Sequence, residues 1–445
     1  MEKRLFSNRQ LMMLIVPLII EQLLSIMVGF VDTVMVSQVG EAAVSAVSLV
    51  DSINLLLINV FMALGTGGAV VASQYVGQGS KDKARYSAKQ LIIVTFLFSV
   101  VISILCLIGN RALLKLVFGD VEESVMSNCL TYFFFSVLSY PFIAMFNSGA
   151  ALFRTMGKAS ISMGNSLIMN VMNIILNAFF IFVMNMGVAG VAIATLISRI
   201  TGCLIVLYLL TNRSNDLYIE DYVHLKPDFS YIKKILTIGI PTGLENGVFQ
   251  LGKIMVASLV STFGTYAIAA NAVTSSLAQF IIVPGQAIGL AMVSVVGVCV
   301  GADDYDQAKY YIRKLLLITH VLMIITTIVI IGFMPLILTL YSLSQEAISL
   351  ASKILHFYAL FAFWLWPISF TFPNALRASN DARFTMIVSF TSMFLFRYVL
   401  SIILGKYVGM GLFGVWIAMI TDWFVRSAFF IYRYKSGKWM NRQLI

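Results

Sequence analysis

The sequence contains little charge for its length. Of 445 residues only 11% are Asp, Glu, Lys or Arg, whereas an ordinary soluble domain has about 25%. Hydrophobic residues make up 60%, and the mean hydropathy is +0.92. A soluble protein of this size needs polar surface to cover its core, and this chain does not have enough. The composition therefore excludes a soluble protein and indicates a polytopic membrane protein.

Cysteine and histidine are also scarce, and neither forms a chemical motif. The four cysteines are far apart in apolar surroundings, which excludes the paired spacing of a zinc site or a disulfide framework. The three histidines are scattered, with no H-E-x-x-H or G-x-S-x-G pattern; they are His224, His320 and His356. No G-x-x-x-x-G-K-[ST] loop is present, which argues against an ATP-driven pump. We therefore predict that the chain is not an enzyme and holds no cofactor.

Long apolar stretches dominate what remains. About 20 apolar residues cross a bilayer as a helix, and twelve such stretches can be marked out. They are continuous runs, not the ten-residue alternating strands of a membrane β-barrel. The predicted spans are 11–36, 44–74, 86–110, 125–149, 160–184, 189–212, 232–261, 267–298, 309–340, 347–376, 384–404 and 409–434. We expect an all-α integral membrane protein with twelve transmembrane helices.

The net charge of +10 has a topological explanation. Basic residues cluster at both ends and in alternate loops, and the opposite loops hold only four, namely Arg111, Lys115, Lys353 and Lys406. By the positive-inside rule, both termini and the basic loops are cytoplasmic. The first span lacks an A-x-A cleavage site and is expected to be retained. We predict a multi-pass protein of the plasma (inner) membrane, without a nucleic-acid partner.

The chain contains an internal repeat with an offset of 224 residues. Pro17 then aligns with Pro241, Glu21 with Glu245, and VGQGSKDKARY (76–86) with VGADDYDQAKY (300–310). Six helices per half is an even number, so both halves insert with the same orientation and form a parallel repeat. Such an architecture suits alternating access.

The repeat also defines the expected domains. Residues 1–212 form the predicted N-lobe, and residues 232–445 form the predicted C-lobe. Residues 213–231 are a polar cytoplasmic linker between them. Six helices belong to each lobe.

Positions at which the two halves differ are candidates for function. Opposite Asp32, Asn173, Asn177 and Thr195 the second half has Val256, Arg397, Ser401 and Met419. The four residues of the first half are expected to lie at similar depths, below the outer ends of their helices. One carboxylate with neutral amide and hydroxyl oxygens suits Na⁺, or a proton on the carboxylate. Asp51 lies at a comparable depth and is a further candidate.

A packing role is the alternative for the neutral members of this set. Asn and Thr in membrane helices often form hydrogen bonds between helices, so Asn173, Asn177 and Thr195 could be structural. A carboxylate within a span is functional by default, which makes Asp32 the central candidate.

At these residues the chain resembles the multidrug and toxic compound extrusion (MATE) family. FVDTVMVSQVG (30–40) is similar to its first-helix signature, NIILNAFFIF (173–182) to its fifth-helix pattern, and GVAGVAIAT (187–195) to its sixth. The resemblance covers essentially the whole chain. It implies an exporter driven by a sodium or proton gradient, with Asp32, Asn173, Asn177 and Thr195 as the cation site.

The resemblance also bears on the coupling ion. Some proton-coupled members carry a second Asp where this chain has Asn177. The absence of that acid here favours sodium as the coupling ion. Sodium-type members carry a carboxylate near Phe249 or Gln250, and here Glu245 lies about one turn away. They also have an Asp in helix 10, and the span 347–376 has no acid.

Further candidates are the other charges within the spans. Glu245, Lys253 and Arg397 are additional candidate site residues; Lys253 could neutralise Glu245 or face the cavity, and Arg397 could pair with Asp422. Pro17 removes a helix hydrogen bond about four turns below Asp32 and is either a hinge or a static kink.

The substrates that we expect are amphipathic organic cations. TYFFFS (131–136), FAFWLWP (361–367) and the 23 methionines offer adaptable apolar contacts for them, although rings at these positions could equally face lipid. The predicted function is export by cation antiport from a monomer in the bilayer. The alternative is a flippase of the same superfamily for lipid-linked oligosaccharide or another amphiphile. A channel is disfavoured because no selectivity loop is evident.

Overall fold

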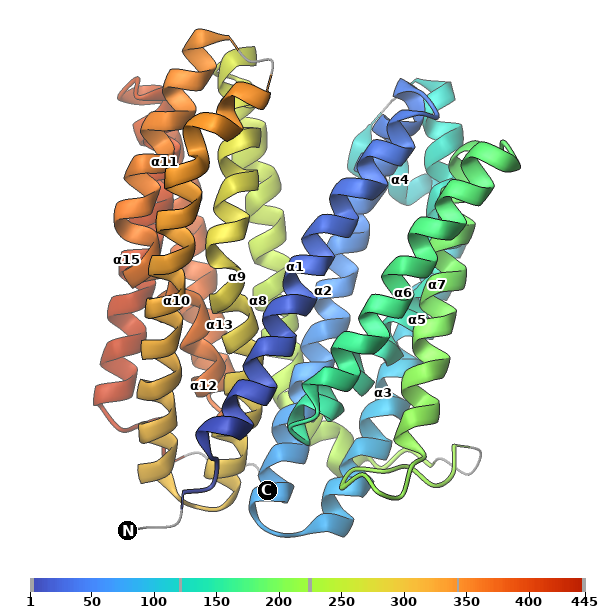
Figure 1. The fold of residues 1–445 in the computed structure, drawn as a ribbon, viewed down its shortest axis with the longest axis vertical. Coiled ribbons are helices and arrows are strands. Elements are labelled where there is room, and N and C mark those ends of the chain that lie inside the picture. Colours follow the sequence, from blue (N-terminus) through green and yellow to red (C-terminus); the bar gives the residue numbers. More distant parts are fainter. Residues whose placement is uncertain (1–3, 120–121, 223–225, 342–343, 442–445) are drawn as a thin grey trace. The chain divides into compact units, whose positions relative to one another are not determined.

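The computed structural model is helical throughout its regular structure in residues 4–119, 122–222, 226–341 and 344–441, the residues that it describes (Figure 1). Outside the described residues lie both chain ends and the part of the predicted linker that contains His224. Eleven helices within the described ranges are long and apolar enough to cross a membrane. The expected all-α membrane class is confirmed.

The first half contains seven α-helices and one short π-helix. They are α1 (Asn8–Ser37), α2 (Glu41–Gly77), α3 (Lys81–Ile108), α4 (Asn110–Phe118), α5 (Glu123–Thr155), α6 (Ala159–Ala178), η1 (Phe179–Val183) and α7 (Gly187–Leu210). Every predicted span of this half coincides with one of the long helices. The nine-residue α4 was not predicted, because it is too short to cross a bilayer.

The second half follows the same order with more interruptions. Its elements are α8 (Phe229–Ser261), α9 (Thr265–Gly301), α10 (Tyr305–Leu340), α11 (Gln345–Trp366), η2 (Pro367–Thr371), α12 (Pro373–Ala378), α13 (Ala382–Ser392), η3 (Met393–Val399), α14 (Leu400–Ile402), η4 (Ile403–Tyr407) and α15 (Gly411–Lys435). The predicted span 232–261 is the continuous helix α8, which is not among the eleven apolar candidates. Glu245, Asn246, Gln250 and Lys253 lower its hydropathy.

The backbone repeats with the same offset as the sequence. Helices α2 and α9 each follow a glycine with positive φ, Gly40 at 130° and Gly264 at 99°. Residues other than glycine rarely adopt such angles, which explains why glycine occurs at both positions. The π-helices η1 and η4 also correspond (179 + 224 = 403). The repeat is therefore a property of the backbone as well as of the side chains.

The chain divides into two compact units, which we describe separately. The N-terminal unit is Ser7–Gly243, and the C-terminal unit contains residues 4–6 and the described residues from Leu244 onward. The division falls within α8.

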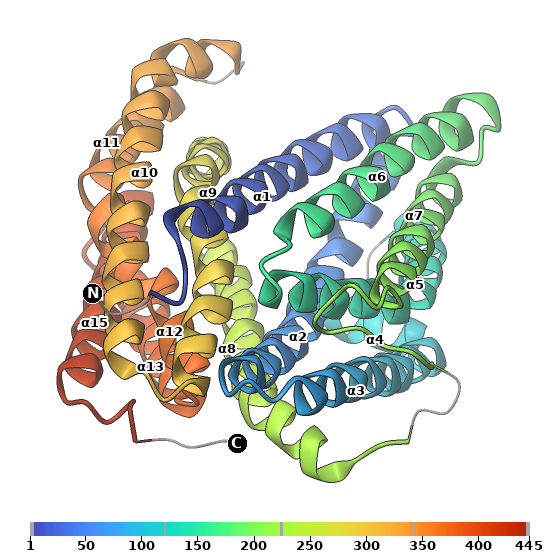
Figure 2. The ribbon, with the colours of Figure 1, turned by 60° about the horizontal axis from the view of Figure 1, so that its bottom comes forward.

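Close helix packing characterises the N-terminal unit. Helix α5 packs against α2 and α7, and α1 packs against α6, beside which it lies in Figures 1 and 2. Phe61, Phe133, Val137 and Tyr140 are fully buried in its core. Because α1 lies along α6, an acid on the last turns of α1 can reach polar groups of α6.

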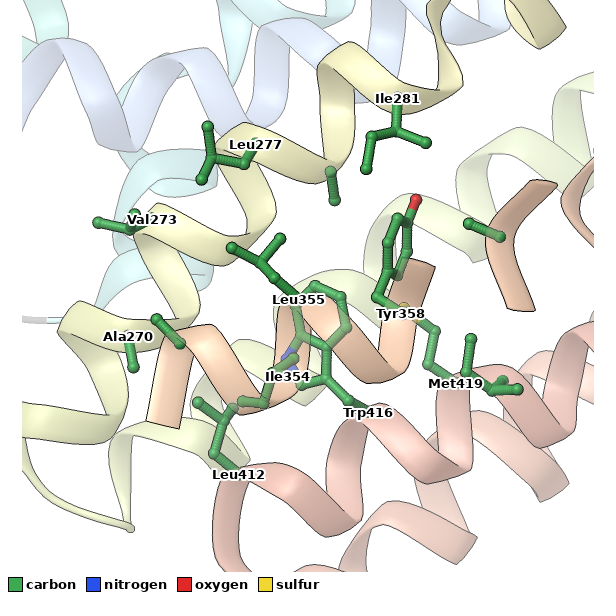
Figure 3. Close-up of a cluster of buried hydrophobic side chains, with 14 of the residues drawn as sticks. Ala270, Val273, Leu277, Ile281, Ile354, Leu355, Tyr358, Leu412, Trp416 and Met419 are labelled. Carbon is green, nitrogen blue, oxygen red and sulfur yellow. The ribbon is translucent and has the colours of Figure 1, made fainter. Parts of the chain in front are cut away.

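An aromatic core fills the C-terminal unit between α9, α11 and α15. Tyr358 lies 5.5 Å, between ring centroids, from both Trp416 and Trp423. Figure 3 shows Tyr358 and Trp416 among aliphatic side chains of α9, including Leu277 and Ile281. This core fixes α15, the helix that carries Asp422 and Arg426.

Candidate functional site

Asp32 lies in the last turns of α1, where its carboxylate is partly buried. Its Oδ1 accepts a hydrogen bond of 2.9 Å from Nδ2 of Asn177 on α6. Helix α6 ends at Ala178 and continues directly into η1. Single-turn π-helices are frequent at functional sites, but the matching η4 shows that this one belongs to the repeat.

Two asparagines of α6 and a threonine of α7 complete the set. Asn173 and Asn177 are one turn apart on one face of the helix, with 7% and 0% exposure. Asn173 Oδ1 accepts from Asn177 Nδ2 at 3.1 Å, and Asn173 Nδ2 lies 3.3 Å from Thr195 Oγ1. The structure thus brings together the four residues that the sequence predicted to share a depth. Their role as a cation site stays a prediction.

The Asn173 amide fits Asp32 in two orientations. When the Asn173 Oδ1 faces Asp32, it lies 3.0 Å from the Asp32 Oδ1, and these two acceptor oxygens need a proton or a cation between them. With Nδ2 toward Asp32, the amide donates to the carboxylate Oδ1 at 3.0 Å and Oδ2 at 3.3 Å, and the Asn173 Oδ1 accepts from Thr195. Amide orientation follows from the surrounding network. Asn173 can therefore contact either an ionised carboxylate or one that holds a cation.

One buried oxygen of the set has no hydrogen-bond partner in the part of the chain that the structure describes. Asn177 Oδ1 is inaccessible and accepts no hydrogen bond from the described residues. A buried amide oxygen normally has a donor or a ligand. No group of three or more His, Cys, Asp or Glu that could hold a metal ion occurs in the described ranges. The donor set is therefore one carboxylate with neutral oxygens, which suits a monovalent cation better than a divalent one.

Asp51 belongs to a neighbouring network on α2 and α5. Its Oδ1 accepts from Asn54 Nδ2 at 3.0 Å and from the Tyr132 hydroxyl at 3.1 Å. The Tyr140 hydroxyl donates to Asn54 Oδ1 at 2.7 Å. Asp51 thus has its own hydrogen-bond partners, and it interacts with Asp32 through electrostatics alone.

The sequence interpretation overlooked Arg199. This side chain, on α7 one turn after Thr195, lies within electrostatic reach of both Asp32 and Asp51, and its Nη1 donates to Ser139 Oγ at 2.7 Å. A detectable signal was present, because an arginine lies inside the predicted span 189–212 and the repeat places Trp423 opposite it. Arg199 supplies a fixed positive charge beside the two acids.

Pro17 lies within α1, and the helix continues through it from Asn8 to Ser37. The absence of a break agrees with either a hinge or a static kink, so the hinge role stays a prediction.

The additional candidate Glu245 is a buried ion-pair partner. It lies 2.8 Å from Arg377 Nη2 and accepts hydrogen bonds from Ser389 at 2.6 Å and Thr385 at 3.2 Å. It does not pair with Lys253, because Arg377 neutralises it.

The first half contains the equivalent arrangement. Glu21 accepts from Ser162 and interacts electrostatically with Arg154, at the corresponding places of the repeat. These acids are therefore shared architecture.

Arg397 and Asp422 do approach one another, but only loosely. Arg397 Nη1 lies 3.8 Å from Asp422 Oδ2, whereas Arg426 Nε lies 3.0 Å from Asp422 Oδ1. The sequence interpretation overlooked Arg426, the main partner of Asp422. Lys253 has no ion-pair partner among the described residues.

Comparisons with known proteins agree with this architecture. The family model MatE matches residues 17–179 and 241–403, and the two matches are offset by 224 residues (241 − 17 and 403 − 179). This offset equals the repeat found in the sequence, so the predicted duplication is confirmed.

Individual relatives match along nearly the whole chain. An uncharacterized transporter, YisQ of Bacillus subtilis, is 27% identical over 96% of this chain and 94% of its own. A probable multidrug resistance protein, NorM of Thermotoga maritima, is 26% identical over 98% and 94%. An outward-facing multidrug resistance MATE family transporter has a TM-score of 0.90 at 21% identity, over 97% of this chain and 96% of that one, which shows the same fold. The chain therefore belongs to the MatE family and is a multi-pass membrane transporter, not an enzyme.

Proposed function

We propose that this transporter exports amphipathic organic cations across the plasma membrane by antiport with Na⁺ or H⁺. The observation that carries the proposal is the convergence of Asn173, Asn177 and Thr195 on Asp32. Relatives named as multidrug resistance proteins support the export of organic compounds. Cytoplasmic termini and a monomeric state are part of the same proposal.

The chemistry of the set supports cation coupling. A carboxylate within a membrane costs several kcal/mol unless it is paired, and the acid of α1 has amides and an arginine nearby but no direct ion pair among the described residues. A proton or Na⁺ that binds Asp32 neutralises it, and the oxygens of Asn173 and Asn177 can turn toward the bound cation. Binding and release of that cation would then change the packing of α1 against α6.

The experiment is efflux of ethidium from proteoliposomes that contain the full chain. A sodium gradient without a pH gradient is applied first, and then the reverse. Efflux should follow one of the two gradients and should be abolished in Asp32→Asn. Since Na⁺ coupling requires Na⁺ binding, ²²Na⁺ binding to the purified protein should be lost in the same variant if sodium drives transport.

Thr33→Ala is the matched control. Thr33 is the exposed neighbour of Asp32, and within the described ranges its hydroxyl donates only to the Gly29 carbonyl, at 2.9 Å. This variant should keep gradient-driven efflux. Undiminished efflux by a folded Asp32→Asn protein would eliminate Asp32 as the coupling residue, and efflux that responds to neither gradient would eliminate antiport.

A further inference from the structure

Positive charge accumulates around Phe249 in the C-terminal unit. Lys253 Nζ lies 5.0 Å from the ring centroid, Arg397 Cζ 5.1 Å and Arg426 Cζ 5.5 Å. The three cations come from α8, η3 and α15. Each is close enough for a cation–π interaction, but one neutral ring cannot neutralise three charges.

Among the described residues, Asp422 is the carboxylate that forms ion pairs with these cations. Asp422 is fully buried, and its Oδ1 accepts from Arg426 Nε at 3.0 Å. Arg426 also donates to Ser389, to Oγ at 3.3 Å and to the carbonyl at 3.1 Å. Arg426 and Asp422 therefore form a direct ion pair through Oδ1, while Asp422 Oδ2 accepts no hydrogen bond from a described residue. Because Asp422 neutralises Arg426, the cluster keeps a net charge of two positive units, on Lys253 and Arg397.

The Arg397 guanidinium has hydrogen-bond donors without acceptors among the described residues. Its side chain is 11% exposed, it makes no hydrogen bond to any described residue, and its buried Nη1 is among the atoms without a partner. A guanidinium has five N–H donors, and leaving a buried charged donor unsatisfied is costly. The 3.8 Å approach to Asp422 does not replace those hydrogen bonds.

Lys253 has no acidic partner among the described residues. The residue lies in the middle of α8 with its side chain exposed on the surface of the unit, and it is near enough to Arg397 for mutual repulsion. Glu245, two turns earlier on α8, is already neutralised by Arg377. An ammonium at this position in contact with lipid tails would be unfavourable, so Lys253 needs water or an anion.

The internal repeat excludes an architectural explanation for the cluster. The corresponding positions of the first half carry no basic residue; opposite Lys253, Arg397, Asp422 and Arg426 it has Gly29, Asn173, Ser198 and Gly202. The positive charge is therefore specific to the second half, in contrast to the shared pairs of Glu21 and Glu245.

We propose that Lys253 and Arg397 bind an oxyanion, a carboxylate, sulfonate or phosphate, carried on an apolar body that packs on Phe249. Arg397 supplies the planar donor pair that suits such groups, and Lys253 supplies a point charge. Phe370 lies 5.6 Å from Phe249 and stacks on Trp366 at 5.1 Å, which extends the apolar surface. This site goes beyond the proposed export of cations and does not depend on the coupling ion.

The test is equilibrium binding of 1-naphthyl phosphate to the full-length protein in phosphatidylcholine nanodiscs. 1-Naphthylmethylammonium is the probe of opposite charge. We expect the phosphate to bind more tightly, and Lys253→Gln and Arg397→Gln to weaken it by roughly tenfold to a hundredfold each, since hydrogen bonds to charged groups contribute about that much. Lys253→Arg should retain most of the binding.

Lys353→Gln is the matched control, since Lys353 also lies over a phenylalanine of this unit, 4.3 Å from the Phe413 centroid, outside the cluster. It should bind like the native chain. Lys253 is exposed and unpaired, so its variant should fold even if that of Arg397 does not. Equal binding of the two probes, or unchanged binding by Lys253→Gln, would overturn the proposal.

A second arm identifies the source of the anion. In nanodiscs with phosphatidylglycerol, loss of naphthyl phosphate binding would assign the site to a lipid headgroup and favour the flippase alternative. Unchanged binding would assign the site to a soluble anion. Asp32→Asn should bind the probe normally in either case, which separates this site from the coupling mechanism.

Discussion

Removing the carboxylate of Glu245 should destabilise the protein strongly. Glu245 and Arg377 are 2.8 Å apart with side-chain exposures of 7% and 10%. In Glu245→Gln the arginine keeps its hydrogen bond to Asn374 at 2.7 Å but loses its counter-charge. Breaking a buried pair on one side costs about 3–5 kcal/mol. At about 2–4 °C per kcal/mol for a domain of this size, the unfolding midpoint should fall by roughly 6–20 °C.

The four buried cysteines provide the assay. All four thiols are free and buried in the folded chain, so a thiol-reactive fluorescent dye reports unfolding on heating. The double variant Glu245→Gln/Arg377→Met removes both charges and should recover most of the lost stability. Asp306→Asn is the control, because its exposed pair with Lys309 should contribute only about 0–1 kcal/mol.

Two outcomes would refute this reasoning. A Glu245→Gln protein that unfolds at the native midpoint would show that the pair is not needed for stability. A double variant as unstable as the single one would show that the unpaired arginine is not the cause.

The remaining predictions concern packing and the first helix. A Cβ at Gly67 would lie 2.4 Å from the Ile235 carbonyl oxygen, so Gly67→Ala should lower the free energy of unfolding by about 1–3 kcal/mol or more. A Cβ at Gly65 would have its nearest atom at 3.5 Å, so Gly65→Ala should destabilise the protein less in the same thermal assay. Equal unfolding midpoints of the two variants would contradict this ranking. The hinge hypothesis for Pro17 predicts that Pro17→Ala slows ethidium efflux and leaves the affinity for the coupling ion unchanged, because a hinge would act on the bending of α1 and not on the carboxylate. Undiminished turnover would identify Pro17 as a static kink.

The sequence alone predicted the membrane spans, the internal repeat and the grouping of Asn173, Asn177 and Thr195 with Asp32. Apolar length and the 224-residue offset both have direct physical causes, the thickness of the bilayer and the duplicated backbone. Depth along a helix follows from residue number, so the sequence alone places Asp32, Asn173, Asn177 and Thr195 at similar depths.

Partner choice among the charged residues could not be predicted. Glu245 pairs with Arg377 across helices, although Lys253 is on the same helix two turns away, because partners are set by the rotation and packing of α8 and α12. Arg199 and Arg426 are visible in the sequence as basic residues within spans, opposite Trp423 and Gly202 in the repeat, but the acids that they approach depend on helix packing. Helix α4 lay below the length that identifies a span.

The aromatic core of the C-terminal unit has a practical consequence for spectroscopy. All five tryptophans of the chain lie in that unit, at positions 364, 366, 416, 423 and 439. Tryptophan fluorescence of the native protein therefore reports on the C-terminal unit, and the half that contains Asp32 has no tryptophan. Once the native indoles are replaced by phenylalanine, a tryptophan at Phe30, a surface position with 69% exposure two residues before Asp32, would serve as a single reporter for the other half.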